Sequence, residues 1–431
     1  MVTKPNIILF ITHDQGQLVG CYDSPQIPNS LNTPNLNRLA EEGVRFTNYF
    51  CTAPQCSPSR GSIQTSLYPH QNGLMGLANP GPKYIYNWTL PKTNKTLPMY
   101  LKENGYTAHL IGLQHESKRF RDIKSTLGYE TKNKIDKIPK FLLKYKDDEN
   151  PFYACIGTFE VHIPFEPFGV PDDPKNVKIP PFLPDHVEVR KDFAEFYGSI
   201  HSVDKMIGKI INCLEVYGMK NNTLFIFTTD HGIPFPRAKC TLYDPGIKTA
   251  LIMSLPNSNL FSGGKVIESM MSNIDLLPTI LDFIGGDIPK NITGKSFLSV
   301  LKNENKIFRK EIFVEKTWHD TYDPMRGIRT ENYKYIRNFE KCETAFEVPA
   351  DMVYQLRTGK LVDKIMKEIY EKPRLDEELY DLRKDPNEIT NVINEPAYDN
   401  VAKELRKKLY DWMEMTNDPI LKGKIMPPKK I

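Results

Sequence analysis

Short apolar runs alternate along the first two thirds of the chain with longer amphipathic segments. The runs predict buried strands because they are short and rich in β-branched and aromatic residues. They are Ile7–Thr12, Ala108–Ile111, Phe152–Thr158, Thr223–Thr229 and Ala250–Ser254. The segments between them predict helices. These are Thr33–Gly43, Phe193–Tyr217 and Asp275–Ile284, the last with Asp275 at the helix start. This alternation predicts an α/β fold with a mostly parallel central sheet flanked by helices.

The pattern changes near residue 306. Ile312–Glu315 and Tyr333–Asn338 predict strands of a small antiparallel sheet, and Val401–Glu414 predicts an amphipathic helix. A chain of 431 residues also exceeds the size at which a single core usually stops growing. We therefore expect an α/β domain over residues 1–306 and a smaller α+β domain over 307–431, packed on the first.

Composition excludes several classes of partner. Lys and Arg number 57 against 53 Asp and Glu, so the formal net charge of +4 is too weak for a nucleic-acid binder. The apolar run Ile7–Ile11 is shorter than a secretory core of about 7–15 residues or a membrane helix of about 20. The sequence thus predicts a cytoplasmic chain without a membrane partner, or one whose leader has been removed. Seven cysteines at irregular spacing do not resemble a disulfide framework.

Polar, chemically capable residues follow three of the predicted strands. They are His13–Asp14, Glu160–His162 and Asp230–His231. Ligands of parallel sheets bind beyond the carboxyl ends of the strands. The three segments therefore predict one shared site, and its ligand could be a small anion such as a sulfated or phosphorylated molecule.

The most informative stretch is Cys56-Ser57-Pro58-Ser59-Arg60, followed by Gly61 and by Ser66-Leu67-Tyr68-Pro69-His70. It resembles the Cys-x-Pro-x-Arg signature of the sulfatase family, which has the alkaline-phosphatase-like fold, and the resemblance extends over essentially the whole chain. It implies that a maturation enzyme oxidises Cys56 to formylglycine. The hydrated aldehyde is then the nucleophile, because its second hydroxyl can expel sulfate, which a thiol cannot do. The resemblance also implies that Arg60 braces this group, and Pro58 favours a helix N-terminus at Cys56.

The resemblance further implies a divalent metal, usually calcium, at the nucleophile. The matching positions, together with Cys56, are His13, Asp14, Asp230 and His231. The family more often has Asp-Asp at the first pair. Two histidines make the site less typical of calcium and leave manganese or zinc open.

Three more positions follow the family pattern. His115 matches the histidine that assists sulfate elimination, His162 the histidine near the leaving group, and Lys239 a sulfate-binding lysine. Leu113 stands where the family commonly has another sulfate-binding lysine. Lys239 or Lys118 could supply part of the missing charge.

Two segments resemble the heparan N-sulfatase (sulfamidase) branch of the family, Asp230–Pro236 and Glu315–Arg326. This implies a hydrolase of N-sulfoglucosamine in heparin-type or heparan-type saccharides, with the leaving amine protonated by His162. His319 and Arg326 are expected to bind the sugar, or else to form an interdomain polar contact.

Other functions stay open. The substrate could be an O-sulfated sugar or an aryl sulfate, and phosphonate monoester hydrolases and phosphodiesterases share the fold. A glycan-binding protein without activity would not need Cys56, Arg60 and His115 together. Specificity depends on the loops Gly76–Trp88 and Lys341–Arg374, whose conformations the sequence does not predict.

Overall fold

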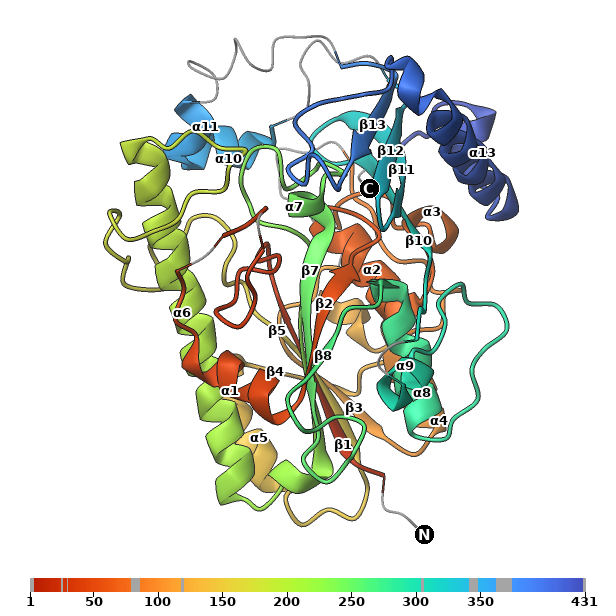
Figure 1. The fold of residues 1–431 in the computed structure, drawn as a ribbon. Helices are drawn as coiled ribbons and strands as arrows, with labels where there is room; N and C mark the ends of the chain where they lie inside the picture. Colours follow the sequence, from red (N-terminus) through yellow and green to blue (C-terminus); the bar gives the residue numbers. More distant parts are fainter. Residues whose placement is uncertain are drawn as a thin grey trace.

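The computed structural model describes residues 4–428 except 25, 29, 79–85, 118–119, 304–305, 341–347 and 362–373. A large sheet with the strand order β4-β3-β5-β1-β6-β7-β2-β8, and with β9 beside β2, forms the centre of the molecule (Figure 1). Its strands are β1 (Asn6–Thr12), β2 (Val44–Phe50), β3 (Thr107–Gly112), β4 (Thr131–Asn133), β5 (Phe152–Gly157), β6 (Thr223–Thr229), β7 (Lys248–Ser254), β8 (Lys265–Ile267) and β9 (Met271–Ser272).

All five strands predicted in this region are present. β1 lies between β5 and β6 and is parallel to both, whereas β7 is antiparallel to its neighbours β6 and β2. The expected mixed, mostly parallel sheet is thus confirmed. It also contains β2, which the sequence analysis did not identify.

Helices cover both faces of this sheet. α1 (Pro34–Glu42), α5 (Ile138–Tyr145) and α6 (Val187–Val216) lie on one side, and α4 (Leu97–Glu103), α8 (Leu276–Phe283) and α9 (Leu298–Lys302) on the other (Figure 1). Side chains of a strand point alternately to its two faces. Accordingly Ile7, Leu9 and Ile11 belong to one apolar cluster and Ile8 and Phe10 to the other. This explains why the run Ile7–Ile11 is continuously apolar.

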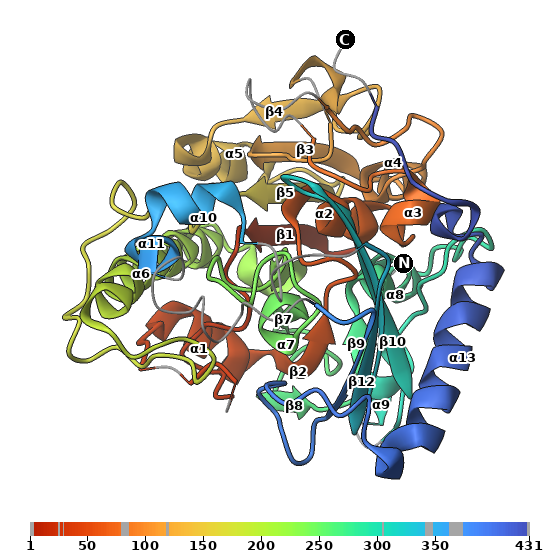
Figure 2. The same cartoon turned by 90° about the horizontal axis from the view of Figure 1, so that it is seen from above.

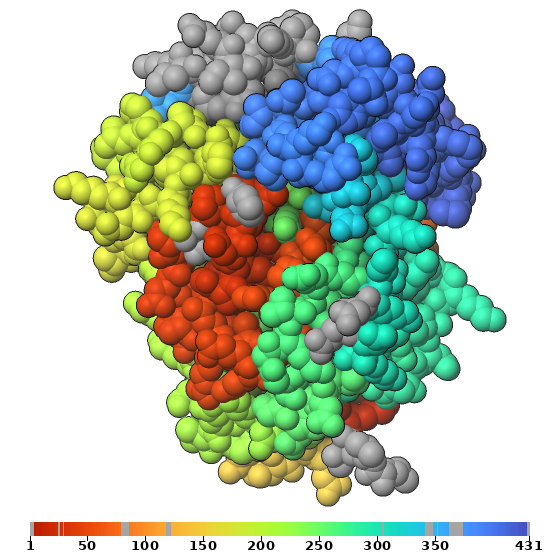
Figure 3. Space-filling view, in the orientation of Figure 1, coloured from red at the N-terminus to blue at the C-terminus, as the bar shows by residue number. Residues whose placement is uncertain are grey.

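A second, antiparallel sheet consists of β10 (Glu311–Trp318), β11 (Tyr322–Thr330), β12 (Tyr333–Asn338) and β13 (Glu377–Asp381), in that order. α13 (Asp399–Met415) lies beside it (Figure 2). Leu405, Leu409 and Trp412 of α13 are buried in the same cluster as β1, so the two sheets share a core. The C-terminal part, blue in Figure 3, covers one end of the molecule.

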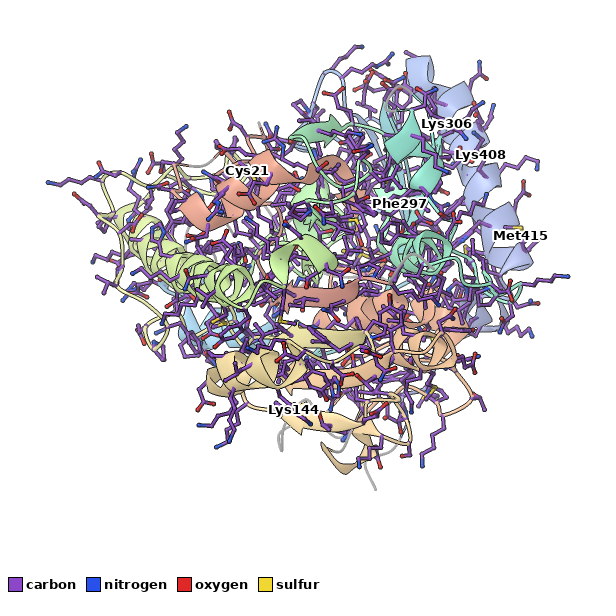
Figure 4. All side chains as sticks on the ribbon, turned by 90° about the horizontal axis from the view of Figure 1, so that it is seen from below. Cys21, Lys144, Phe297, Lys306, Lys408 and Met415 are labelled. Carbon is purple, nitrogen blue, oxygen red and sulfur yellow. The ribbon has the colours of Figure 1, made fainter. Side chains whose placement is uncertain are left out.

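The surface of α13 shows the amphipathic pattern that the sequence predicts. Lys408 and Met415 project outward from it in Figure 4, and Met415 is 74% exposed. Phe297, in contrast, is buried and packs against Phe46 with ring centroids 5.3 Å apart.

The remaining short helices are α2 (Cys56–Thr65), α3 (Pro69–Asn72), α7 (Asp244–Ile247), α10 (Ala350–Gln355) and α11 (Arg357–Leu361). Within the described ranges, no helix is long and apolar enough to cross a membrane.

Asp275 is at the start of a helix, as expected, and has a second function. It forms a capping box with Ser272, whose backbone N–H donates to its carboxylate at 2.9 Å. The same carboxylate pairs with Arg309, which precedes the second sheet. Asp275 therefore links the helix of the first sheet to the chain entering the second.

Candidate active site

The carboxyl ends of β1, β5 and β6 meet the N-terminus of α2. His13 and Asp14 follow β1, Asp230 and His231 follow β6, and His162 lies in the loop after β5. The backbone N–H of Asp14 donates to Asp230 Oδ1 at 2.9 Å. The three polar segments that the sequence analysis identified at strand ends therefore lie together.

Cys56 is the first residue of α2, after an extended Gln55. Its Sγ lies 3.5 Å from Asp14 Oδ1 and 3.2 Å from His231 Nε2, and the residue is only 2% exposed. Burial and the adjacent Asp14 carboxylate raise the pKa of the thiol well above its usual value. An unmodified Cys56 is therefore a protonated thiol and a weak nucleophile.

Two buried carboxylates face Cys56. Burial alone would raise the pKa of Asp230, but His231, His13 and Arg60 outweigh it and hold the pKa at about 2. Burial opposes ionisation of Asp14 as well. Lys239, which has the largest opposing effect, and the neighbouring histidines nevertheless hold the pKa of Asp14 well below its usual value. Both residues are thus carboxylates at neutral pH, as metal ligands must be.

His13 completes a set of donors that fits a metal. Ligand atoms of His13, Asp14, Cys56 and Asp230 all lie within 4.8 Å of one another. Both ring nitrogens of His13 are buried and have no hydrogen-bond partner in the described part of the chain. Burial and then Arg60 lower the pKa of His13 to about 4, so its imidazole is neutral and able to bind a cation.

Two cations flank the carboxylates. Arg60 is 1% exposed and donates from Nε to Asp230 Oδ2 at 3.0 Å and from Nη2 to the carbonyl of Thr12 at 3.2 Å. Lys239 donates from Nζ to Asp14 Oδ2 at 2.6 Å. Each carboxylate is thus paired with one cation, which offsets the cost of burying the charge.

His162 and His115 both lie near His13, with ring centroids 5.7 and 5.6 Å from it. His162 Nδ1 lies 2.7 Å from the carbonyl of Ile163 and donates to it, which leaves Nε2 to face Lys239 at 3.4 Å. Burial lowers the pKa of His115 well below its usual value. Leu113 is half-buried and its backbone N–H donates to Gly157 at the end of β5. Lys118 lies outside the described residues.

The structure corrects the expectation that Arg326 binds substrate. Its side chain is 0% exposed, and its guanidinium pairs with Asp418 and with Glu315, the latter at 3.3 Å. It also donates to the carbonyl of Lys316 at 2.8 Å. A guanidinium enclosed by these partners cannot contact a sugar. These contacts are also not the interdomain contact that was the alternative, because Glu315, Lys316 and Asp418 all lie within the predicted C-terminal domain, residues 307–431.

His319 is also enclosed, with 3% exposure and Nδ1 3.6 Å from Asp320 Oδ2. It nevertheless follows a strand end that reaches the site, because Gln55 donates to the carbonyl of the adjacent Trp318 at 2.8 Å. Most of the specificity loops, residues 79–85, 341–347 and 362–373, lie outside the described residues.

Two residues of the site were missed from the sequence. Glu116 is buried, contributes to the electrostatic environment of Arg60, and accepts the backbone N–H of His115 at 2.7 Å. Phe159 is 44% exposed and its ring centroid lies 5.1 Å from that of His162. Its position in Phe159-Glu160-Val161-His162, two residues after a strand end, was the available signal.

Comparisons with known proteins identify the family of this chain. A family model described as Sulfatase matches residues 5–286, and one described as N-sulphoglucosamine sulphohydrolase, C-terminal, matches residues 237–351. The chain therefore belongs to the sulfatase family, and it is a sulfate ester or sulfamate hydrolase.

The sequence identity to individual relatives is low. An ulvan-active sulfatase of Formosa agariphila is 28% identical, with 96% of this chain and 76% of that protein aligned. The human N-sulphoglucosamine sulphohydrolase is also 28% identical, over 96% of this chain and 91% of its own length. A solved structure in complex with its substrate, D-glucosamine-2-N,6-O-disulfate, superposes with a TM-score of 0.71 at 20% identity, covering 96% of this chain and 98% of the other. The expected resemblance to the N-sulfoglucosamine branch is confirmed.

Proposed function

We propose that this protein hydrolyses the N-sulfate group of an N-sulfoglucosamine residue in a heparin-type or heparan-type saccharide. The observation that carries the proposal is the match of residues 237–351 to the C-terminal model of N-sulphoglucosamine sulphohydrolase. The relation to the human enzyme of that name, over most of both chains, supports it.

The nucleophile in this proposal is formylglycine made from Cys56 by a maturation enzyme. Its hydrate supplies one hydroxyl to attack sulfur and a second whose deprotonation releases sulfate. In the structure, the Sγ atom of Cys56 stands in for the attacking oxygen. Because Cys56 opens α2, backbone N–H groups of the first turn face the sulfate oxygens that gain charge.

A bound divalent metal would be held by His13, Asp14, Asp230 and His231, and it would polarise the sulfate and favour ionisation of the hydrate. Lys239 contacts Asp14 and His162, and its ammonium group would bind a sulfate oxygen beside them. Arg60 holds the Asp230 carboxylate in place through the hydrogen bond from its Nε.

Two histidines move protons in this scheme. When the S–N bond breaks, the departing amine needs a proton, and His162 can supply it from Nε2 because Nδ1 is occupied by the Ile163 carbonyl. His115 is held neutral by its burial and can accept a proton from the hydrate when sulfate leaves. Phe159, exposed beside His162, offers an apolar face to the sugar ring.

The test is sulfate release from matched N-sulfated, 6-O-sulfated and aryl-sulfated substrates. The protein should be produced with a maturation enzyme, and mass spectrometry should show the Cys56 peptide about 18 Da lighter than with cysteine, the change of thiol-to-aldehyde oxidation. Cys56→Ala is the control and should release no sulfate. Preferential N-sulfate release supports the proposal.

A second candidate is hydrolysis of an O-sulfated saccharide. It is favoured by the relation to the ulvan-active sulfatase, which has the same 28% identity as the human relative. Preference for the 6-O-sulfated substrate would select it. Preference for an aryl phosphonate, added as a fourth substrate, would instead select the phosphonate monoester hydrolase class.

A further inference from the structure

The metal-binding cluster contains two imidazoles, His13 and His231, beside the carboxylates of Asp14 and Asp230. His231 Nδ1 lies 3.1 Å from the carbonyl of Gly232, to which it donates. The opposite nitrogen, Nε2, lies 2.8 Å from Asp14 Oδ1 and 3.2 Å from Cys56 Sγ. With Nδ1 donating to Gly232, Nε2 is the nitrogen of His231 that faces Asp14 Oδ1 and Cys56 Sγ, so it is the atom that a metal between them would take as a ligand.

His13 presents a nitrogen to the Asp14 and Asp230 carboxylates of the same cluster. It is 1% exposed, its Nδ1 lies 3.3 Å from Asp230 Oδ2, and both ring nitrogens lack a hydrogen-bond partner among the residues described. Buried polar groups of folded proteins are almost always satisfied. A cation shared with Asp14, Asp230 and Cys56 would satisfy His13, because all four ligand atoms are within 4.8 Å of one another.

Charge alone does not attract a metal strongly to this cluster. The carboxylates of Asp14 and Asp230 are already paired with Lys239 and Arg60, so these four groups sum to zero formal charge. Calcium binds through charge and through six to eight oxygen ligands. The cluster instead offers nitrogen lone pairs, which suit first-row transition metals.

We propose that the site selects a first-row transition dication, with Zn²⁺ as its representative, over Ca²⁺, and that His13 and His231 are the ligands that determine this choice. The inference deepens the proposed function, since it identifies the ion of the same site. It concerns binding, and so it can hold whichever sulfated substrate the enzyme uses.

The first experiment is titration of the chelator-treated protein with Zn²⁺ and with Ca²⁺, followed by calorimetry. We expect Zn²⁺ to bind at least tenfold more tightly. Co²⁺, added as a spectroscopic probe, should give visible absorption bands that change when a histidine ligand is replaced. Tighter binding of Ca²⁺ to the unaltered protein would overturn the inference without recourse to any variant.

The second experiment replaces the nitrogen ligands with oxygen ligands. His13→Asp combined with His231→Asn should weaken Zn²⁺ binding at least tenfold, strengthen Ca²⁺ binding and alter the Co²⁺ spectrum. His231→Asn alone should do so in part, and serves if the double variant does not fold. His201→Asn is the matched control, because His201, on α6, pairs with Asp172 and its replacement should leave the preference unchanged.

If the folded variants keep the Zn²⁺ preference, the histidines do not select the metal and the inference is wrong. Sulfate release is measured separately on the same samples. A protein that prefers Zn²⁺ but releases no sulfate would contradict the proposed function and support the metal inference, so the two failures are distinguishable.

Discussion

Arg326→Met tests whether the buried arginine of the second sheet holds the fold together or binds substrate. Arg326 lies on β11, Glu315 on β10 and Asp418 beyond α13, so its ion pairs join three separate parts of the chain. Its side chain is 0% exposed, and Nη2 donates to Asp418 Oδ1 at 3.0 Å. Methionine fills much of the volume but leaves both carboxylates without their cation.

The expected loss of stability follows from those contacts. Removing one partner of a buried ion pair costs about 3–5 kcal/mol. The lower end applies, because Glu315 still accepts two hydrogen bonds from His70 and Asp418 one from Ile420. At about 2.1 cal/mol/K per residue, unfolding 431 residues as one unit has an entropy of about 0.9 kcal/mol/K. A loss of about 3 kcal/mol therefore lowers Tm by about 3 °C.

The assay pairs thermal unfolding with kinetics. Lys407→Met is the control, since Lys407 and its partner Asp411 on α13 are both exposed, and such surface pairs contribute at most about 1 kcal/mol. Arg326→Met should lower Tm more than this control does and change KM less than twofold. An unchanged Tm with KM raised tenfold would refute the reasoning and indicate that Arg326 binds the substrate.

Three further substitutions test the roles proposed in the site. His162→Asn should slow N-sulfate release about 10²–10⁴-fold and aryl sulfate release much less, because an aryl oxide leaves without a proton; equal losses in kcat would exclude a general acid. Lys239→Met should reduce kcat/KM about 10²–10³-fold, as loss of one buried donor to a developing anion does, and unaltered turnover would contradict its contact with sulfate. Phe159→Ala should raise KM for the saccharide several-fold, by about 1 kcal/mol, while the inhibition constant of inorganic sulfate stays constant.

The elements that the sequence predicted correctly are those whose burial is visible locally. Ile7–Thr12 and Thr223–Thr229 are apolar on both faces, and both strands were identified with nearly their observed bounds. β2 was missed because Arg45, Thr47 and Asn48 interrupt its apolar residues, and its hydrogen bonds go to β7, about 200 residues further along the chain. Such partners cannot be deduced from a local pattern.

β11 is another strand that the local sequence pattern does not predict. Its sequence, Tyr322–Thr330, contains Asp323, Arg326 and Arg329, and the sequence analysis predicts no strand there. All three charges are buried, because Lys316 and Arg374 pair with Asp323, and carboxylates on distant segments pair with both arginines. Burial of a charge depends on a partner. Since those partners are far away in the chain, the sequence alone favours exposure.

The convergence of His13, Asp14, Asp230 and His231 could be predicted, because these residues follow strands directly and the carboxyl ends of parallel strands converge. The sequence could indicate that His13 and His231 replace oxygen ligands, but it could not show how their nitrogens are directed. That depends on Gly232, whose carbonyl orients His231, and on the burial of His13.

The same charge balance accounts for the departure at Leu113. Asp14 and Asp230 are neutralised by Lys239 and Arg60, so the cluster itself is close to neutral. A dication then gives the pocket a formal charge of about +2, which exceeds the single negative charge of a sulfate monoester or sulfamate. A further lysine at position 113 would add attraction that this balance does not require. Retention of the anion would then depend on the bound metal, and chelation should weaken substrate binding as well as turnover.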